Sequence, residues 1–332
     1  MLLFAAPDWP VGLAAPVILL IALALDAVIG DPRWLPHPVR LMGGFVALLD
    51  RALNRESHGH AARMVLGAVA VLLVTGAGAA AGWAVAEQVA ALRWGWVAEA
   101  ALVAVLLAQR GMADHMVRVA RALDAGLDEA RAAVRHIVGR DVRTLDEPGI
   151  SRAAIESCAE NYSDGVVAPA FWYLLLGLPG LLAYKAINTL DSMIGHRSAR
   201  HHAFGRAAAR LDDLANLVPA RIAGALIALA ALTIPGAAGD RAFRTMLRDA
   251  RLHSSPNAGW PEAAMAGALG LALLGPRDYG DHAAADTAWL GDGRTAAQAA
   301  DVRRATRLFA AACALVAVLA AAIAAGWALG AG

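Results

Sequence analysis

Charged side chains are scarce in this chain of 332 residues. Asp, Glu, Lys and Arg make up 17% of it, whereas 59% of its residues are hydrophobic and its mean hydropathy is +0.52. This composition excludes a disordered chain, a collagen and a coiled coil, and is typical of a protein that lies partly in lipid. The formal net charge is +1 and the basic residues are dispersed, so no basic patch is available for nucleic acid. The composition therefore predicts a membrane protein without a nucleic-acid partner.

Cysteines are few, and the common nucleotide-binding and nucleophile motifs are absent from the sequence. Cys158 and Cys313 are the two cysteines, and two such distant residues form neither a disulfide framework nor a metal cluster. The sequence contains no P-loop, no G-x-G-x-x-G after a strand, and no H-E-x-x-H, C-x-x-C or G-x-S-x-G. A nucleotide would therefore need a less common binding arrangement.

Uncharged runs that are long enough to span a membrane are present instead. A transmembrane helix needs about 20 mostly apolar residues, and the segments between the runs lack the alternation of strands. The sequence predicts an all-α, polytopic integral membrane protein with about four to six spanning or re-entrant helices. We expect one membrane-embedded domain over residues 1–332, with helical cytoplasmic regions at about 109–164 and 240–307. The candidate runs are 64–86, 308–332, 11–29, the shorter 94–108, and the Pro- and Gly-interrupted 165–184 and 222–239.

The distribution of basic residues predicts the orientation. Five of them lie in 30–63 and eight in 109–164, but only one lies in 87–93. By the positive-inside rule the first two regions are cytoplasmic and the short loop is outside. The N-terminus is then outside as well. The apolar stretch near it has no basic leader, so we expect a retained span rather than a cleaved signal peptide.

Strict alternation conflicts with this rule further along the chain. It would place 185–221, with six basic residues, outside the cell. An alternative lets 165–184 and 222–239 dip into the membrane without crossing it, so that everything from 109 to 307 faces the cytoplasm. Non-helical backbone at membrane depth is tolerated where protein or a cavity buries it. The Pro and Gly interruptions therefore indicate a cavity.

Acids at helical spacing form the first candidate site. Glu156, Glu160 and Asp164 stand at i, i+4 and i+8, with Asn161 at the edge of their face. Because like charges at this spacing repel, the stack favours a cation such as Mg²⁺, which binds carboxylates together with substrate phosphate. The alternative is a solvated acidic face on which Arg152 pairs with Glu156.

A second polar stripe follows the apolar run that ends near residue 184. Lys185, the only lysine, is followed by Asn188 and Asp191 at spacings of three. A lone lysine suits phosphate contact, but equally a side chain that snorkels to the membrane surface. Asp212 and Asn216 stand at i and i+4 beside Asp213, with Arg221 beyond them. This pattern suits a metal bound to phosphate, or an acidic helix start favoured by the helix dipole.

Two loops complete the set of candidates. DPRWLPHPVR carries Asp31, Arg33, His37 and Arg40 on a backbone stiffened by three prolines, where a histidine is more often a brace than a catalyst. HSSPNAGWPEA carries His253, Ser255, Asn257 and Glu262. Its backbone donors could hold an anion at a helix N-terminus, or its Ser and Asn could only cap that helix.

Five long motifs together resemble one family. They are DAVIGDPRWLPHPVRLMG, IESCAENYSDGVVAPAFW, LPGLLAYKAINTLDSMIGHR, FGRAAARLDDLANLVPARIAG and HSSPNAGWPEAAMAGAL. In this order they are similar to the CobD/CbiB family of membrane-bound adenosylcobinamide-phosphate synthases of cobalamin biosynthesis. The resemblance covers nearly the whole chain and weakens after Gly275.

The resemblance implies a ligase that depends on ATP and Mg²⁺. It would join a carboxylate of adenosylcobyric acid to the amine of (R)-1-aminopropan-2-ol phosphate and give adenosylcobinamide phosphate. Because an ionised carboxylate does not condense with an amine near neutral pH, it must first be activated, for example as an acyl phosphate. Such activation needs Mg²⁺, phosphate-binding cations and exclusion of water.

We assign roles to the candidate residues on this basis, and expect them to converge in one pocket on the cytoplasmic side of the cell membrane. His253 is chosen for proton transfer because the ordinary imidazole pKa lies near neutral pH. Contact with downstream enzymes of the pathway is a further hypothesis. The predicted catalytic residues are His253, Asp191 and Lys185; the predicted metal ligands are Glu156, Glu160, Asp164, Asp212 and Asp213; the predicted substrate and phosphate contacts are Asn161, Asn188, Arg197, Asn216, Arg221, Ser255, Asn257, His37 and Arg40.

Two other functions fit the same residues. An intramembrane, prenyltransferase-like enzyme would also hold Mg²⁺-diphosphate with acids and Asn near a membrane cavity. A transporter for a corrinoid or another polar solute is suggested by the broken helices. Transporters usually place polar groups within their spans, whereas most of these lie in loops, which favours an enzyme at the membrane surface.

Overall fold

The computed structural model describes residues 15–30, 37–139, 141–196, 198–275, 277–278, 283–284 and 288–330. Its contacts divide the chain into two compact units that are interleaved in sequence. The first holds Met1–Leu107, Ala168–Asn216 and Ala320–Gly332, and the second holds Ala108–Val167 and Leu217–Leu319. The single membrane-embedded domain expected from the sequence stays a prediction.

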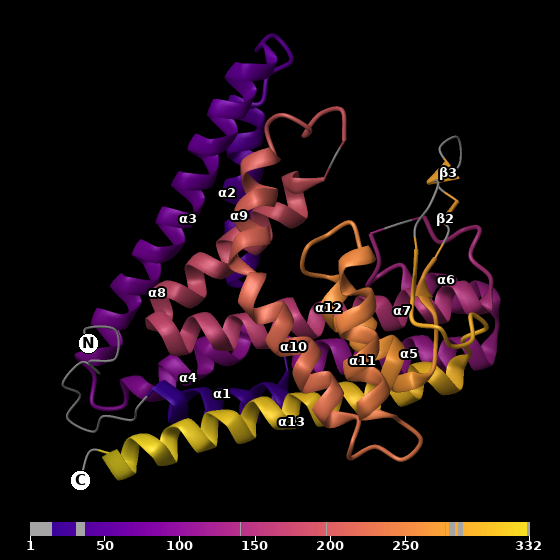
Figure 1. The fold of residues 1–332 in the computed structure, drawn as a ribbon. Coiled ribbons are helices and arrows are strands. Elements are labelled where there is room, and N and C mark those ends of the chain that lie inside the picture. Colours follow the sequence, from indigo (N-terminus) through magenta and orange to yellow (C-terminus); the bar gives the residue numbers. More distant parts are fainter. Residues whose placement is uncertain are drawn as a thin grey trace. The chain divides into compact units, whose positions relative to one another are not determined.

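The first unit is helical throughout its described part (Figure 1). Helices α3 and α8 pack against each other most extensively, and α2 and α9 also pack on α3. The α-helices are α1 (Ala15–Ile29), α2 (Pro38–Leu53), α3 (His60–Ala90), α4 (Gly95–Leu106), α8 (Ala168–Leu190), which a π-helical turn (Asp191–Gly195) extends, and α9 (Arg206–Ala215). Apolar residues of α2, α3, α8, the π-helical turn and the loop before α9 form the core: Val46, Val71, Val74, Leu190, Ile194 and Phe204 are all buried there.

Helix α8 is broken where the sequence carries its Gly and Pro residues. Gly177 adopts φ 65° and ψ −153°, which is left-handed backbone that a side chain disfavours, and Pro179 follows inside the same helix. The predicted interruption of 165–184 is therefore present as a kink. Beyond it, the helix carries Tyr184 and Lys185 into the unit, where both are buried.

A polar cluster holds the loop after residue 195 against α2. Arg200 and His201 lie 2.8 and 3.3 Å from the Asp50 carboxylate, and Asn54 donates to Asp50 Oδ1 at 2.7 Å. Burial by itself would raise the pKa of Asp50, but the hydrogen bonds from Asn54 and Arg200 outweigh it and lower that pKa. Asn54 and Arg63 also donate to the Arg200 carbonyl.

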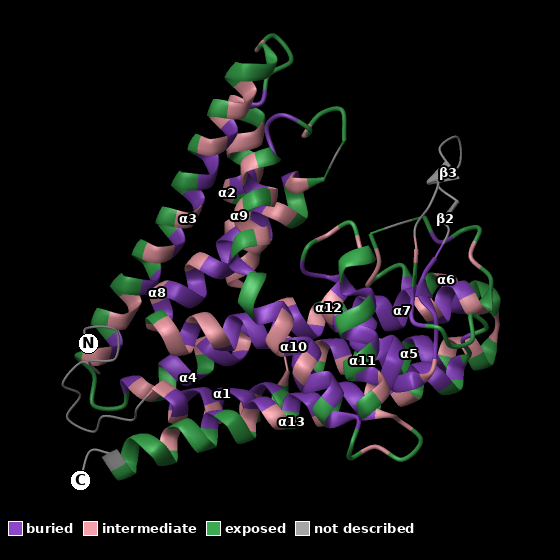
Figure 2. Ribbon diagram, viewed as in Figure 1, coloured by how far each residue is buried: buried purple, intermediate pink, exposed green. Residues whose placement is uncertain are grey.

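The second unit is mainly helical and surrounds the buried helix α12 (Gly259–Leu269). In its described part, α10 and α11 both pack on α12, and most α12 residues are buried (Figure 2). The other elements are α5 (Gln109–Ala125), α6 (Leu127–Val134), α7 (Glu147–Tyr162), a π-helical turn (Ser163–Val167), α10 (Leu217–Ala230), α11 (Gly239–Asp249), a 3-10 turn (Ala250–Leu252), β1 (Leu273–Leu274), β2 (Arg277–Asp278), β3 (Ala283–Ala284), β4 (Trp289–Leu290) and α13 (Ala299–Gly330), which continues into the first unit.

In the part of the chain that the structure describes, the strands are short and follow α12. β1 pairs antiparallel with β4, and β2 with β3, over two residues each. Sequence patterns missed them because two residues cannot show alternation. β2, β3 and β4 lie after Gly275, where the family resemblance weakens, and the four strands leave the all-α class unchanged.

Within the described residues, four helices are long and apolar enough to cross a membrane, which confirms the predicted polytopic class. They are His60–Ala90, Gly95–Ala125, Glu147–Gly195 and Ala299–Leu329; a fifth is present if the broken pair Arg206–Ala215 and Leu217–Ala230 counts as one span. Large apolar side chains are exposed along α3 and α13, among them Leu72, Trp83 and Val318. Exposed apolar faces of this kind suit lipid. One predicted run is shorter than expected, because α10 ends at Ala230 rather than near 239. Residues 11–14 of the first predicted run lie outside the described residues.

Candidate functional site

Three acids come together in the first unit, from two segments of the chain. Asp191 opens the π-helical turn after α8, and Asp212 and Asp213 lie on α9. All three carboxylates interact electrostatically with one another. Helix α9 packs on that turn, so the fold brings together acids that the sequence separates by some twenty residues. The sequence pattern predicted Asp191 as a catalytic residue and the adjacent Asp212 and Asp213 as metal ligands.

Asp212 is held at one oxygen and open at the other. Asn216 donates to Asp212 Oδ2 at 3.0 Å, and Asn188 lies beside the carboxylate. Asp212 Oδ1 is buried and has no hydrogen-bond partner. An unpaired buried carboxylate oxygen is costly, so it indicates a missing donor or cation.

Tyr184 is a member of this cluster that sequence reasoning missed. Its hydroxyl donates to Asn216 Oδ1 at 3.0 Å, so that the amide group of Asn216 faces Asp212. The indole of Trp172 donates to the Ala215 carbonyl at 3.1 Å and fixes the end of α9. Tyr184 directly precedes Lys185 in the motif AYKAIN, but an aromatic residue in an apolar run gave no signal of its own.

Lys185 and Gly195 shape the same region. Lys185 is buried, with 8% of its surface exposed, which disagrees with a side chain that snorkels to the surface. Gly195 lies so close to Asp191 that a Cβ built on it would be 2.0 Å from Asp191 Oδ1. The carboxylate thus occupies space that only a glycine leaves open.

The acids of the first unit fit Mg²⁺ only together with a phosphate. No three His, Cys, Asp or Glu side chains in the described part of the chain are placed to hold a metal ion by themselves. Mg²⁺ usually keeps several waters and binds one or two carboxylates plus substrate phosphates. Asp212, with its unpaired oxygen, and the adjacent Asp191 and Asp213 fit such a partial ligand set.

The second unit gathers a different set around the start of α12. His253 Nδ1 accepts the Ser255 N–H at 2.9 Å, which leaves the proton of a neutral ring on Nε2. Nε2 lies 3.8 Å from Glu262 Oε1, and Glu262 is 3% exposed. Glu262 was noted in the sequence but given no role. Its carboxylate can stabilise an imidazolium on His253 and fix the ring orientation.

Arg221 reaches this set from α10. It donates to Asn257 Oδ1 at 3.2 Å and stacks over the Trp260 ring, 4.6 Å from its centroid. A stacked guanidinium keeps donors available at its edge for a carboxylate or phosphate. Ser255 Oγ accepts the N–H groups of Asn257 and Ala258, both at 3.2 Å, so Ser255 caps the turn that precedes α12. The alternative interpretation, in which Ser and Asn cap the helix itself, is wrong, because the N-cap residue of α12 is Ala258 and no side chain caps it.

The three acids predicted on one α-helical face do not form one stack. Glu156 and Glu160 lie on α7, but Asp164 lies in the π-helical turn that follows, which breaks the i, i+4, i+8 register. Glu156 is buried and accepts the Leu274 N–H at 2.9 Å, whereas Glu160 is exposed. The prediction of a continuous α-helical face is therefore wrong at Asp164.

Asn161 lines a hollow of about 430 Å³ in the second unit. The imidazoles of His115 and His136 line it as well, and they interact electrostatically. Asn161 donates to the Ser157 carbonyl at 2.8 Å. Sequence reasoning selected Asn161 but neither histidine, because they lie 21 positions apart with no motif between them.

The early proline-rich loop contributes a brace. His37 Nδ1 accepts the Val39 N–H at 3.2 Å and caps α2, while Nε2 is 2.9 Å from the Val105 carbonyl. Arg40 is exposed on α2. Asp31, Arg33 and Arg197 lie outside the described residues. The predicted single pocket, which would unite residues of both units, stays a prediction.

Comparison with known proteins identifies relatives along nearly the whole chain. A family model described as CobD/Cbib protein matches residues 19–309. A "Cobalamin biosynthesis protein CobD" of a Sinorhizobium species is 52% identical over 308 residues, which cover 91% of this chain and 95% of the relative. Proteins of the same description from Brucella anthropi and Rhodobacter capsulatus are 48% and 46% identical, each over 88% of this chain and 92% of the relative. No solved structure matches the chain.

Proposed function

The chain belongs to the CobD/CbiB family, and from this premise we propose that it acts in cobalamin biosynthesis as an ATP-dependent amide ligase. Its reaction joins a carboxylate of adenosylcobyric acid to the amine of (R)-1-aminopropan-2-ol phosphate. The enzyme is a multi-pass protein of the cell membrane, with its site on the cytoplasmic side. Its substrates are a corrinoid and an aminoalcohol phosphate, and its cofactors are ATP and Mg²⁺.

The observation that supports this proposal most directly is the buried, half-satisfied carboxylate of Asp212 beside Asp191 and Asp213. One or two of these acids would hold Mg²⁺ together with a substrate phosphate, whose charge the bound ion would neutralise. Tyr184 and Asn216 orient Asp212 through the two hydrogen bonds described above. Lys185 supplies a compact positive charge in the same unit for phosphate oxygens.

The residues of the second unit suit the second step of an amide ligation, in which the amine attacks the activated carboxyl group. The attacking amine must lose a proton, and His253 can accept one while the Glu262 carboxylate stabilises the resulting imidazolium. Arg221 and Asn257 present donors and an amide group for an anionic or amide-bearing substrate. Burial of this region, including Glu262 and Asn257, limits the access of water to an activated carboxyl group.

The metal role of the acids predicts the first mutational result. Asp191→Asn and Asp212→Asn, each made separately, are expected to lower amide formation by about 100-fold or more, because charge stabilisation of the transferred phosphate is lost. Purified protein in detergent would be assayed with adenosylcobyric acid, the amine phosphate, ATP and Mg²⁺. Asp240→Asn, an exposed acid that pairs with Arg244, is the matched control and should react like wild type. Unchanged turnover in both test variants would remove the metal site.

The substrate assignment has its own test. In a strain that lacks the gene, corrinoids analysed by mass spectrometry should accumulate as the cobyric acid form, and the gene should cure this. The prenyltransferase-like alternative predicts activity on polyprenyl diphosphate without corrinoids. The transporter alternative predicts corrinoid uptake into vesicles without bond formation.

A further inference from the structure

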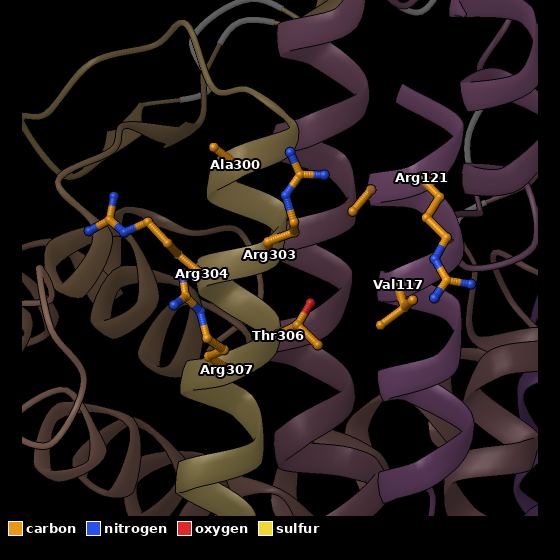
Figure 3. A pocket seen from close by; sticks show the side chains of 8 residues that line it. Val117, Arg121, Ala300, Arg303, Arg304, Thr306 and Arg307 are labelled. Carbon is orange, nitrogen blue, oxygen red and sulfur yellow. The ribbon is translucent and has the colours of Figure 1, made fainter. Parts of the chain in front are cut away.

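Arginines line a hollow between α5 and α13 that the proposed ligase reaction does not use. The hollow has a volume of about 650 Å³ and lies within the second unit (Figure 3). Arg121 and Val117 belong to α5, while Arg303, Arg304, Thr306 and Arg307 belong to α13. None of the described residues that line it is acidic. Four arginines thus line a space that could hold a small anionic group.

The four arginines differ in whether their guanidinium groups already bind other groups of the protein. Arg304 lies 3.3 Å from Asp301 and also donates to the Leu269 carbonyl, so its guanidinium is held by the protein. Arg303 pairs with Asp124 at 2.8 Å, and both side chains are about half exposed. Among the described residues, Arg121 and Arg307 have no hydrogen bond or ion pair. These two exposed cations keep all their donors available.

The position of the hollow along α13 suits a phosphate group. Arg307 is the last charged residue of α13, and the helix continues as an apolar span with exposed Val318, Leu319 and Ile323. Arginines at the end of such a span lie at the level of lipid headgroups. Basic pockets between membrane helices bind phosphate-bearing headgroups, and the planar guanidinium matches phosphate oxygens two at a time.

We propose that the hollow between α5 and α13 is a binding site for a phosphate group, with Arg121, Arg303 and Arg307 as its contacts. The phosphate is carried either by an anionic phospholipid or by a small soluble molecule. Arginines that only orient the helix in the membrane would not bind a phosphate group specifically. The site is separate from the residues assigned to ligation and does not depend on that activity.

Two probes distinguish the two sources of phosphate. The full-length protein would be reconstituted in nanodiscs of phosphatidylcholine with or without phosphatidylglycerol, and native mass spectrometry would count the phosphatidylglycerol it retains. In parallel, inorganic pyrophosphate would be titrated into protein in neutral detergent, and binding followed by thermal shift. The test variant is Arg121→Gln/Arg307→Gln. The control, Arg51→Gln/Arg244→Gln, removes the same charge at exposed positions outside the hollow.

Wild type and the control are expected to bind one of the two probes, and the test variant to bind it about tenfold more weakly or worse, as charge-assisted hydrogen bonds are lost. Arg121→Lys/Arg307→Lys keeps the charge but not the planar donors, so it should bind between the two. Retained phosphatidylglycerol would identify a lipid site, and pyrophosphate binding a site for a soluble phosphate. Binding of neither probe by wild type, or equal binding by all variants, would overturn the proposal.

Discussion

A glycine determines where the Asp191 carboxylate lies. A methyl group at Gly195 would come within 2.0 Å of Asp191 Oδ1, which is the movable end of a side chain rather than backbone. Gly195→Ala should therefore cost little stability but displace the carboxylate. Because a misplacement of about 1 Å can cost 100-fold in rate, we expect amide formation to fall by about tenfold or more.

The control for Gly195→Ala is available in the same unit. Gly44 lies on α2 and a Cβ there would meet nothing within 4 Å, so Gly44→Ala should keep full activity. Both variants would be compared in the ligation assay and in thermal unfolding. Full activity of a folded Gly195→Ala protein would show that the position of Asp191 does not matter for the reaction.

Asp249 is expected to make stability depend on pH. The Asp249 carboxylate is buried and accepts two hydrogen bonds from the Arg248 guanidinium, at 2.6 and 2.8 Å. It also accepts the Gly291 N–H at 2.8 Å, and this bond connects α11 to the strand pair of β1 and β4. Burial alone would raise the pKa of Asp249, but these hydrogen bonds outweigh it and lower the pKa below the ordinary value of 3.8. A carboxylate with a lowered pKa stabilises the fold above its unfolded pKa and loses this effect as pH falls through the folded value.

Asp249→Asn should therefore destabilise the protein near neutral pH and not at low pH. Because Arg248 is half exposed, we expect a loss of about 1 kcal/mol at pH 7. The difference from wild type should shrink once the pH falls below 3.8. Denaturant unfolding of both proteins over this range measures it. A difference that stays constant with pH would show that the charge of Asp249 contributes nothing.

Sequence reasoning selected side chains but not their partners. Asp212, Asn216 and His253 were predicted because acids, amides and imidazoles stand out in an apolar chain. Tyr184 positions Asn216 and comes from an apolar run. Glu262 contacts His253 and comes from a helix start. Their roles depend on contacts between distant segments, which spacing along one helix does not show.

At the scale of elements, the close approach of α3 and α8 depends on glycines. A Cβ on Gly82 would lie 2.5 Å from the Leu178 carbonyl oxygen and 2.6 Å from Pro179 Cα, and this backbone cannot move aside easily. Small residues at four-residue spacing, here Gly78 and Gly82, are typical of membrane helices in close contact. Gly76, on the same helix, meets nothing within 4 Å.

Gly82→Ala is therefore expected to destabilise the first unit by about 1–3 kcal/mol through overpacking. Gly76→Ala serves as the control on the same helix and should be neutral or slightly stabilising, because alanine favours the helix. Thermal unfolding in one detergent compares the two. Equal melting temperatures for the variants would mean that α3 and α8 are not packed as closely as described.

The helices were more predictable than their irregularities. Long uncharged runs predicted α3 and α13 because a span must be apolar over its whole length. The two π-helical turns, at Ser163–Val167 and Asp191–Gly195, follow no pattern of residue types, yet they carry Asp164 and Asp191. Each adds a residue to a helical turn and so changes which side chains share a face.

At the scale of the whole molecule, one cluster constrains how the chain crosses a membrane. Asp50 and Asn54 precede α3, and both contact Arg200. The loops around residues 54–59 and 198–205 must therefore lie on the same side of any bilayer that α3 crosses. Three candidate spans separate these loops, namely His60–Ala90, Gly95–Ala125 and Glu147–Gly195. Three complete crossings would place the loops on opposite sides.

At least one of the three segments therefore does not cross the membrane completely, and we expect it to enter and leave on the same face. Glu147–Gly195 has 49 residues, about 70 Å of helix, which is enough to go into a hydrocarbon core of about 30 Å and return. It also contains the kink at Gly177 and two π-helical turns. These features support the predicted dip of 165–184, which removes the conflict between the basic residues of 185–221 and the positive-inside rule.

Single-cysteine reporters test this topology. Gly59→Cys and Ala199→Cys, at exposed positions of the two loops, should react with a membrane-impermeant maleimide from the same side, and Arg93→Cys from the opposite side. The natural Cys158 and Cys313 are buried and should give little background. Intact and permeabilised cells distinguish the sides, and the positive-inside rule assigns Gly59 and Ala199 to the cytoplasm. If Ala199→Cys instead reacts together with Arg93→Cys, Glu147–Gly195 crosses completely, and the contact between Asp50 and Arg200 cannot exist in the membrane.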